Sequence, residues 1–463
     1  MTNLTNRRAG ILRPLFAAAI ACSAAGCAVD SEPMRSPDAP AAWQGRGGPG
    51  HVDADWWRAF GDPVLARLVV EALAHNLDVR LAEARVNEVR ALSKVEHSEE
   101  LPSVDIGAAA ARADSVNVVT RRPYYATNWQ EQFQASYEVD LWGRVHSLGQ
   151  AADARLAGSQ AARDAVALSV AAETASAYVN LRALDERLDI ARQTLKSREG
   201  ALAFARARLA RGYASKLELL QAESEFHATA EVLPQLELQI RRREHALQIL
   251  LGADPAEVPR GAPMSSIIAP AVPDTGVPSD LLHRRPDIAQ AEAQVIANDR
   301  ELAASKARLL PALQITGGFG AVGSTALIGD PFKVWSLGAS VLAPVFEGGR
   351  LKAQVDVQRS RREQALVGYE KVVLNAFAEV EDQLAAIELL AKQAVELDEQ
   401  RVSAQEALRV AHDRYRAGYS NYLEELDAQR SLFSVQQRSV ELRADLLVAH
   451  IDLYRALGGG WRP

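Results

Sequence analysis

Side chains able to do catalytic or metal chemistry are scattered along the chain instead of clustered. Residues Gly318 to Gly323 match the glycine fingerprint of dinucleotide-binding proteins, but that fingerprint must open a helix, and residues 324–331 are typical of a loop. The nine histidines form neither an HExxH pair nor a ligand-like pair beside a carboxylate. No Walker A sequence occurs, and no Ser or Cys has a recognisable nucleophile setting. The sequence therefore predicts a protein that is not an enzyme, with no catalytic residue, no metal site and no bound cofactor.

Both cysteines, Cys22 and Cys27, lie in the N-terminal segment. Residues 1–26 have a basic start, a short apolar core and small residues at the end, which is typical of a secretory signal peptide and too short for a membrane span. The run from Ala24 to Cys27 resembles a bacterial lipobox, although the usual pattern has Leu where Ala24 stands. We therefore predict a covalent lipid, including palmitate, on Cys27; an ordinary cleavage site with an incidental cysteine is the alternative. Ala28 implies sorting to the outer membrane, because lipoproteins retained at the inner membrane usually carry Asp there.

The mature chain is acidic. The whole sequence has a net charge of −7, and removal of residues 1–26, which hold three arginines and no acid, makes it −10. No basic block offsets this charge, so nucleic acid is excluded as a partner.

Four segments alternate between apolar and other residues, and they predict two β-hairpins. The clearest alternation runs from Phe133 to Leu141 and follows a loop through residues 121–125. The other strands are expected around Val104–Ala110, Leu313–Phe319 and Trp335–Val345. Aromatic residues gather near the strand ends, as in the belts of outer-membrane proteins: Tyr124, Tyr125, Trp129, Trp142, Phe332, Trp335 and Phe346.

Apolar residues at helical spacing predict six helices before, between and after these strands. The longest runs from Val145 to Arg211, roughly 65 residues or about 100 Å at 1.5 Å per residue. A second rod covers Gly349 to Arg416, and both are far longer than the helices of an ordinary globular domain. The shorter helices are expected at Val64–Glu99, Lys216–Leu251 with a bend at Pro234, Pro286–Leu309 and Tyr422–Leu457.

The two halves of the chain repeat each other. Leu77-Asp78-Val79 matches Pro286-Asp287-Ile288, and Gly212-Tyr213 matches Gly418-Tyr419. Internal duplication therefore organises the chain. After the signal peptide we predict a tether at 27–61, a first repeat at 62–251, a connector at 252–280, a second repeat at 281–457 and a tail at 458–463.

Two hairpins give one chain only four strands, and a four-stranded sheet in lipid would leave the backbone groups of its two edges unpaired. Copies of the chain must therefore complete a barrel. Two copies would give eight strands, whose interior is usually filled, and three would give twelve, wide enough for a channel. The inward-facing residues are small or polar, which favours the trimer: Ser136, Thr316, Gly318 and Ser340. We predict an α+β membrane protein whose homotrimer forms a 12-stranded barrel and an α-helical tunnel; a soluble sheet with one wet face is the alternative.

Several motifs resemble those of the TolC/OprM family of outer-membrane efflux proteins, nearest its lipoprotein branch. They are Trp56 to Pro63, Arg284 to Ile288, Leu250 to Gly252, Arg414 to Arg430 and the terminal run from Ala456 to Trp461. The resemblance covers essentially the mature chain. It implies a trimer anchored in outer-membrane lipid and extending into the periplasm, with a mixed equatorial belt. It also implies docking to a periplasmic adaptor (membrane fusion) protein and to an inner-membrane efflux pump, expected to be proton-driven.

The resemblance also assigns roles to the helix-to-helix turns, which form the periplasmic end of the tunnel in this family. Residues that would dock the adaptor are Gly212, Tyr213, Ser215, Gly418, Tyr419 and Asn421, although they cap helices in any case. Residues that would gate the tunnel are Glu424, Asp427, Glu218, Tyr415, Arg414 and Arg416. We expect Glu425, between the two acids of the second turn, to lie on a solvated helix face.

The function implied is passive conduction of drugs or other small molecules delivered by the pump. The exit duct of a type I protein secretion system, which shares the architecture, is the alternative. A trimeric surface stalk is disfavoured, because it would lack the twofold repeat and the returning helices. With three methionines in the chain and none in the rods, a dedicated copper or silver exporter is also disfavoured.

Overall fold

The computed structural model describes residues 39–45, 47, 52–116, 119–325 and 331–462. The chain forms two compact units. The first contains Asn87–Gly158 and Ala291–Tyr369; the second contains Pro37–Val86, Ser159–Gln290 and Glu370–Pro463. The expected signal peptide and Cys27 lie outside the described residues.

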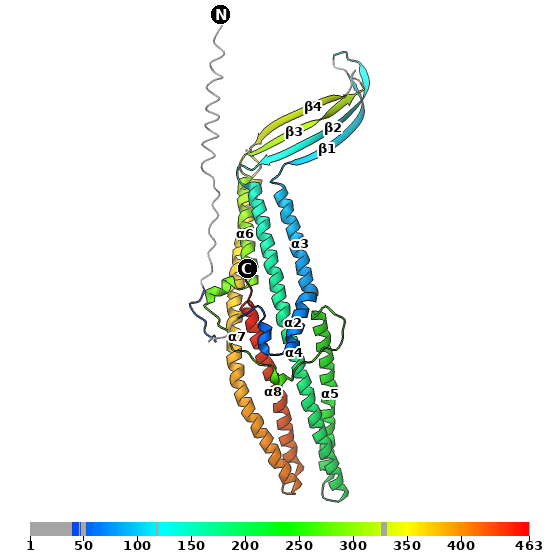
Figure 1. Ribbon diagram of the computed structural model, residues 1–463, viewed down its shortest axis with the longest axis vertical. Coiled ribbons are helices and arrows are strands. Elements are labelled where there is room, and N and C mark those ends of the chain that lie inside the picture. The colour runs from blue at the N-terminus through cyan, green and yellow to red at the C-terminus, as the bar shows by residue number, and fades with distance from the viewer. Residues whose placement is uncertain (1–38, 46, 48–51, 117–118, 326–330, 463) are drawn as a thin grey trace. The chain divides into compact units, whose positions relative to one another are not determined.

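One antiparallel sheet dominates the first unit (Figure 1). Its strands follow the order β1 (Ser103–Val116), β2 (Pro123–Val139), β3 (Ala312–Ser324) and β4 (Phe332–Leu342). Each half of the chain contributes one hairpin, β2 and β3 pair to join them, and β1 and β4 form the edges. The two predicted hairpins are confirmed.

Several predicted strand limits are wrong. The strands β1 and β3 continue to Val116 and Ser324, beyond the predicted ends at Ala110 and Phe319, and β2 ends at Val139 and not at Leu141. The strand β2 begins at Pro123, so Tyr124 and Tyr125 lie in the strand and not in a loop. The strand β4 ends at Leu342 and not at Val345. Pro344 follows closely, and a proline has no N–H to donate to the strand ladder.

The register gives the sheet one apolar and one polar face. On the apolar face Ile106, Phe133, Phe319 and Trp335 stand opposite one another across all four strands. All four side chains are exposed, Trp335 by 77%. The polar face carries the expected small and polar set, with Ser136 opposite Thr316, Gln134 opposite Gly318 and Gln314 opposite Ser340. The residues that the structure describes thus leave the apolar face uncovered.

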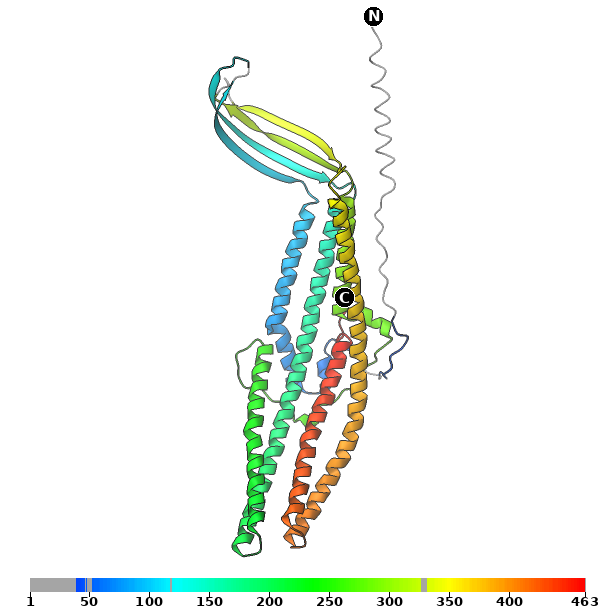
Figure 2. The ribbon, with the colours of Figure 1, turned by 180° about the vertical axis from the view of Figure 1, so that it is seen from behind.

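Helix lengths confirm the duplication. The two rods have 67 residues each, the helices that return from them 35 each, and the helices before the hairpins 22 each. The return helix α5 runs beside α4, and α8 runs beside α7 (Figures 1 and 2). Pro234 lies inside α5. The helices are α2 (Pro63–His75), α3 (Leu77–Ser98), α4 (Arg144–Ala210), α5 (Lys216–Leu250), α6 (Pro286–Ala307), α7 (Arg350–Arg416) and α8 (Tyr422–Ala456).

The predicted continuous helix from Val64 to Glu99 is wrong, because Asn76 divides it. Asn76 has ψ near 135°, outside the helical range. Its side-chain amide donates to the carbonyl of Leu250 at 3.0 Å, while its Oδ1 accepts from the N–H groups of Asp78 and Val79. One side chain therefore ends α2, caps α3 and ties both to the end of α5.

Charged contacts join neighbouring helices within the first unit. His97 of α3 lies 3.1 Å from both carboxylate oxygens of Asp153 on α4. The hydrogen bond to Asp153 is the main cause that raises the pKa of His97. Arg155 of α4 pairs with Glu301 of α6, and Arg362 of α7 contacts Asp299 of the same helix.

Aromatic packing fixes the start of the second unit. The 3-10 helix η1 (Trp56–Phe60) buries Trp56, which stacks on Tyr454 of α8 at 5.5 Å between ring centroids. Asp62 then caps α2 and also accepts a hydrogen bond from the buried Tyr178 hydroxyl of α4. The connector residues pack here as well, with Met264 and Ile267 in the same core. Two further 3-10 helices, η2 (Met264–Ser266) and η3 (Pro278–His283), lie in this stretch.

Within the described residues, none of the helices has the combination of length and hydropathy that a membrane-spanning helix requires.

Candidate functional site: the ends of the two helix hairpins

The two helix-to-helix turns are built alike. Gly212 and Gly418 adopt positive φ angles of 77° and 79°, which a residue with a Cβ adopts only with strain. The N–H of Tyr213 donates to the carbonyl of Arg208, and that of Tyr419 donates to Arg414, both at 2.9 Å. This is the bond that closes a helix end through a left-handed glycine.

The residues that start the return helices also correspond. Ser215 accepts from the N–H of Glu218 at 3.2 Å, and Asn421 accepts from Glu424 at 3.3 Å. Both residues are therefore N-caps. Between cap and glycine, Tyr213 and Tyr419 are 72% and 81% exposed. Each hairpin end thus presents one tyrosine ring to solvent.

A buried tyrosine joins the two hairpins. Tyr415 of α7 is 3% exposed, and its hydroxyl donates to Glu218 of α5. Arg208 of α4 lies beside both, 3.6 Å from the Glu218 carboxylate and 4.9 Å from the centre of the Tyr415 ring. The pKa of Tyr415 is raised mainly by burial and, to a smaller extent, by the hydrogen bond to Glu218. The hydroxyl therefore remains protonated, and a donor, at physiological pH. The structure therefore brings together two of the six predicted gate residues.

The other four predicted gate residues lie near the surface. Arg414 and Glu424 approach to 3.9 Å with both side chains about half exposed. Arg416 lies over the Phe204 ring at 5.8 Å. Asp427 is exposed on α8, one turn after Glu424, and its charge contributes to raising the pKa of Arg430 after the larger effect of Glu225.

A second ionic layer lies farther along the helices and was not predicted. Arg198 of α4 and Glu225 of α5 are each only 5% exposed, and their side chains meet at 2.8 Å. Arg198 also donates to the Glu225 carbonyl at 2.9 Å. Arg430 of α8 donates through Nε to the same carboxylate at 2.9 Å. Glu225 therefore holds three helices together, from both halves of the chain.

The expectation for Glu425 is wrong, because its side chain is buried. It is 2% exposed, accepts from Gln429 at 3.0 Å and lies 2.8 Å from Nδ1 of His412 on α7. The spacing along the helix indicates the burial of both acids, because each lies on the same helix face as a buried residue. Glu225 lies three residues after the buried Ala222, and Glu425 lies three residues after the buried Tyr422.

The hairpin ends thus offer positioning and electrostatics but no reactive group. Among the described residues, no His, Cys, Asp and Glu side chains are grouped as metal ligands. What the arrangement can do is hold two helix pairs together through buried carboxylates while it exposes aromatic and acidic side chains at the tips.

A family comparison assigns this architecture. The model of the family described as "Outer membrane efflux protein" matches residues 68–253 and 277–459, one match for each half of the duplication. The chain belongs to this family. It is a bacterial outer-membrane efflux channel protein and not an enzyme.

Individual relatives agree with the family assignment. The pyoverdine export outer membrane protein OpmQ of Pseudomonas putida is 33% identical over 97% of both chains. The probable outer membrane lipoprotein SilC of Salmonella typhimurium is 31% identical over 89% of both. Among solved structures, the outer-membrane channel OprN superposes with a TM-score of 0.88 at 28% identity, covering 94% of this chain and all of that one. The α+β fold predicted from the sequence is therefore confirmed.

The substitution Glu225→Gln should loosen the hairpin ends, because it leaves Arg198 buried without a counter-charge. Breaking such a buried pair costs about 3–5 kcal/mol. Hydrogen exchange should accelerate at least about 100-fold at the backbone amides of α4 and α8 that lie near Arg198 and Arg430 and that exchange by local opening. The factor follows because 1.4 kcal/mol corresponds to about a tenfold change. Hydrogen exchange followed by mass spectrometry measures this.

Glu223→Gln is the matched control, two residues earlier on the same helix. Glu223 pairs with Arg206 at 3.0 Å near the surface, where an ion pair contributes at most about 1 kcal/mol. Equal exchange rates in the two variants would show that the buried pair does not hold the helices together.

Proposed function

We propose that three copies of this chain form the exit duct of a tripartite efflux system. The sheet is the observation that most strongly supports this, because its exposed apolar face suits lipid and its edge strands need partners. In hydrocarbon an unpaired backbone group costs several kcal/mol, so β1 and β4 must pair with other copies. The small residues of the polar face, such as Ser136 and Gly318, favour twelve strands around an open channel over eight around a filled one.

Exposed apolar side chains along α7 support the same assembly. They recur at intervals typical of one helix face and are exposed on the described part of the chain: Val367, Leu374, Val395, Val402 and Val410. In the proposed trimer the helices of neighbouring copies cover them, and the rods form a tunnel across the periplasm.

The exposed hairpin ends suit docking of a periplasmic adaptor, which links the duct to a proton-driven pump in the inner membrane. Tyr213 and Tyr419 offer rigid aromatic contact area there, with Gly212, Gly418 and the caps Ser215 and Asn421 fixing the turns. The transported compounds are drugs or other small molecules, and export by the relative named for pyoverdine supports this class.

Cross-linking in intact envelopes followed by purification of the duct tests this proposal. We expect a trimeric species together with an adaptor and a proton-driven pump, identified by mass spectrometry. Recovery of a secretion ATPase in place of the pump would indicate a protein secretion duct. A water-soluble monomer obtained without detergent would contradict the duct altogether.

We infer further that the bond between Tyr415 and Glu218 holds the periplasmic end of the duct closed. The tyrosine belongs to the second half and the carboxylate to the first, so separation of the two hairpins must break the bond. The exposed acids Glu424 and Asp427 would form rings in the trimer that attract cations and repel one another in the closed state. Near these acids, Arg414 and Arg416 supply the positive charges of the closed end.

Tyr415→Phe should therefore raise the conductance of the purified protein in planar bilayers. The lost hydrogen bond to a charged group contributes about 1.5–3 kcal/mol, which corresponds to at least about a tenfold change in the open-to-closed ratio. Tyr419→Phe is the control, since it removes an exposed hydroxyl at the tip.

The acidic pair is tested in the same assay. Glu424→Ala combined with Asp427→Ala should also raise conductance, because the closed end then loses the cations that the acid rings attract and the contact between Glu424 and Arg414. Conductance identical to wild type in this variant would exclude the two acids from the gate, and identical conductance in Tyr415→Phe would exclude the tyrosine.

A lipid on Cys27 anchors the duct in the outer membrane in this proposal, which the lipobox-like run before Cys27 and a lipoprotein among the relatives support. Radioactive palmitate should label the wild-type protein in cells, and Cys27→Ser should abolish the label. Label that persists in this variant would point to Cys22 and contradict the assignment.

A further inference from the structure

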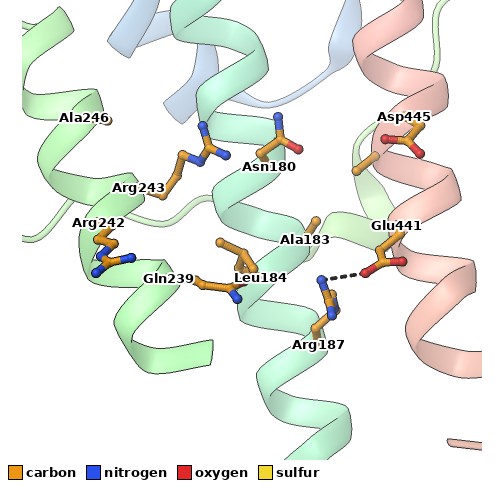
Figure 3. A pocket seen from close by; sticks show the side chains of 11 residues that line it. Asn180, Ala183, Leu184, Arg187, Gln239, Arg242, Arg243, Ala246, Glu441 and Asp445 are labelled. Carbon is orange, nitrogen blue, oxygen red and sulfur yellow. Dashed lines mark ion pairs between the residues drawn. The ribbon is translucent and has the colours of Figure 1, made fainter. Parts of the chain in front are cut away.

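An open groove of about 510 Å³ lies between α4, α5 and α8 in the second unit (Figure 3). The helix α5 forms a basic wall and α8 an acidic one, with α4 as the floor. The side chains that define the charge of the groove are Arg242 and Arg243 of α5, Arg187 of α4, and Glu441 and Asp445 of α8.

The groove lies on the side of these helices that faces away from the connector. On α4, Tyr178 and Asp185 contact the connector residues Gly261 and Arg260. Asn180 and Arg187, each two residues later, line the groove, and two residues correspond to about 200° around a helix.

The other two helices repeat this arrangement. On α5, Glu244 binds Arg260 of the connector, and Arg242, two residues earlier, lines the groove. On α8, Arg443 donates to the carbonyl of Ser265, while Glu441 and Asp445 lie two residues on either side of it. All three helices therefore present one face to the connector and the opposite face to the groove.

This inference rests on the proposed function, because only in a trimeric duct does one face of these helices line a tunnel. If three copies close a tube, one face of this helix layer must line it. Three connectors, with their buried residues Met264 and Ile267, would fill the axis and obstruct passage. The groove side, which is open and charged, must then line the tunnel.

The groove has an excess of positive charge. Its lining carries three arginines, Arg187, Arg242 and Arg243, against the two carboxylates of Glu441 and Asp445. Glu441 forms an ion pair with Arg187, with 2.7 Å between the charged atoms. The dashed line in Figure 3 marks this pair. Arg242 and Arg243 are exposed, and neither has an ion pair within the described part of the chain.

We propose that this groove is an anion-binding site on the tunnel wall, at which Arg242 and Arg243 of each copy hold the anionic group of a passing organic solute. The planar guanidinium fork matches carboxylate, sulfonate and phosphate groups. Three copies place six such arginines around one level of the tunnel, and rings of Arg select for anions.

The test uses the purified full-length protein in planar bilayers under a KCl gradient, with citrate as the anionic probe. The variant is Arg242→Gln with Arg243→Gln. Both side chains are exposed, so the variant should fold. Arg241→Gln is the control, because it removes one arginine charge, against two in the variant, from the preceding residue, about 200° around the helix from Arg243.

We expect the reversal potential of the double variant to report a chloride-to-potassium permeability ratio at least about twofold below wild type, and citrate to inhibit its current less. Arg241→Gln should match wild type in both measurements. Equal shifts in the two variants, or none in either, would overturn the binding site. A wild-type protein that forms no trimer and no channel would instead contradict the proposed function.

Discussion

The pairing of backbone hydrogen-bonding groups at the edges of the sheet is the constraint on which this structure depends. One chain supplies two hairpins, joined through β2 and β3, and leaves β1 and β4 at the edges. A row of exposed apolar side chains from Ile106 to Trp335 crosses all four strands, and this face suits lipid. The edges of the same sheet carry backbone N–H and C=O groups that lipid cannot hydrogen-bond. The association of copies that we propose resolves this conflict, and in it the long helices of neighbouring copies come together with the strands.

At the carboxyl-terminal ends of the rods, buried carboxylates join helices of the two halves. Glu218 and Glu225 both lie on α5, and each accepts from a residue of the second half, Tyr415 in one layer and Arg430 in the other. A carboxylate can accept several donors at once, so it can join helices without a large apolar contact. Such contacts are broken at a definite cost and re-formed without repacking a core, which suits the opening and closing that we propose for this end.

The apolar periodicity of the sequence was enough to locate the rods, because it continues over 67 residues in each. The predicted and observed limits of α4 and α7 differ by at most one residue. It missed the break at Asn76, which arises from a contact to Leu250, 174 residues away in sequence. It also missed the burial of Glu425, because an acid on a helix is usually solvated. The family motif from Arg414 to Arg430 pointed to Tyr415, which the structure shows bonded to Glu218. Other motif residues, such as Trp56 and Arg285, specify packing elsewhere in the second unit.

The equal lengths of corresponding helices have a consequence for how such a chain can change. Tyr415 reaches Glu218 only while both hairpins end at the same level, and this requires 67 residues in α7 for 67 in α4. Seven residues inserted into one rod alone would displace its end by about 10 Å. In the proposed duct, insertions and deletions that keep this bond must therefore occur as matched changes in both halves, so a change in the length of the tunnel needs two coordinated changes in one gene.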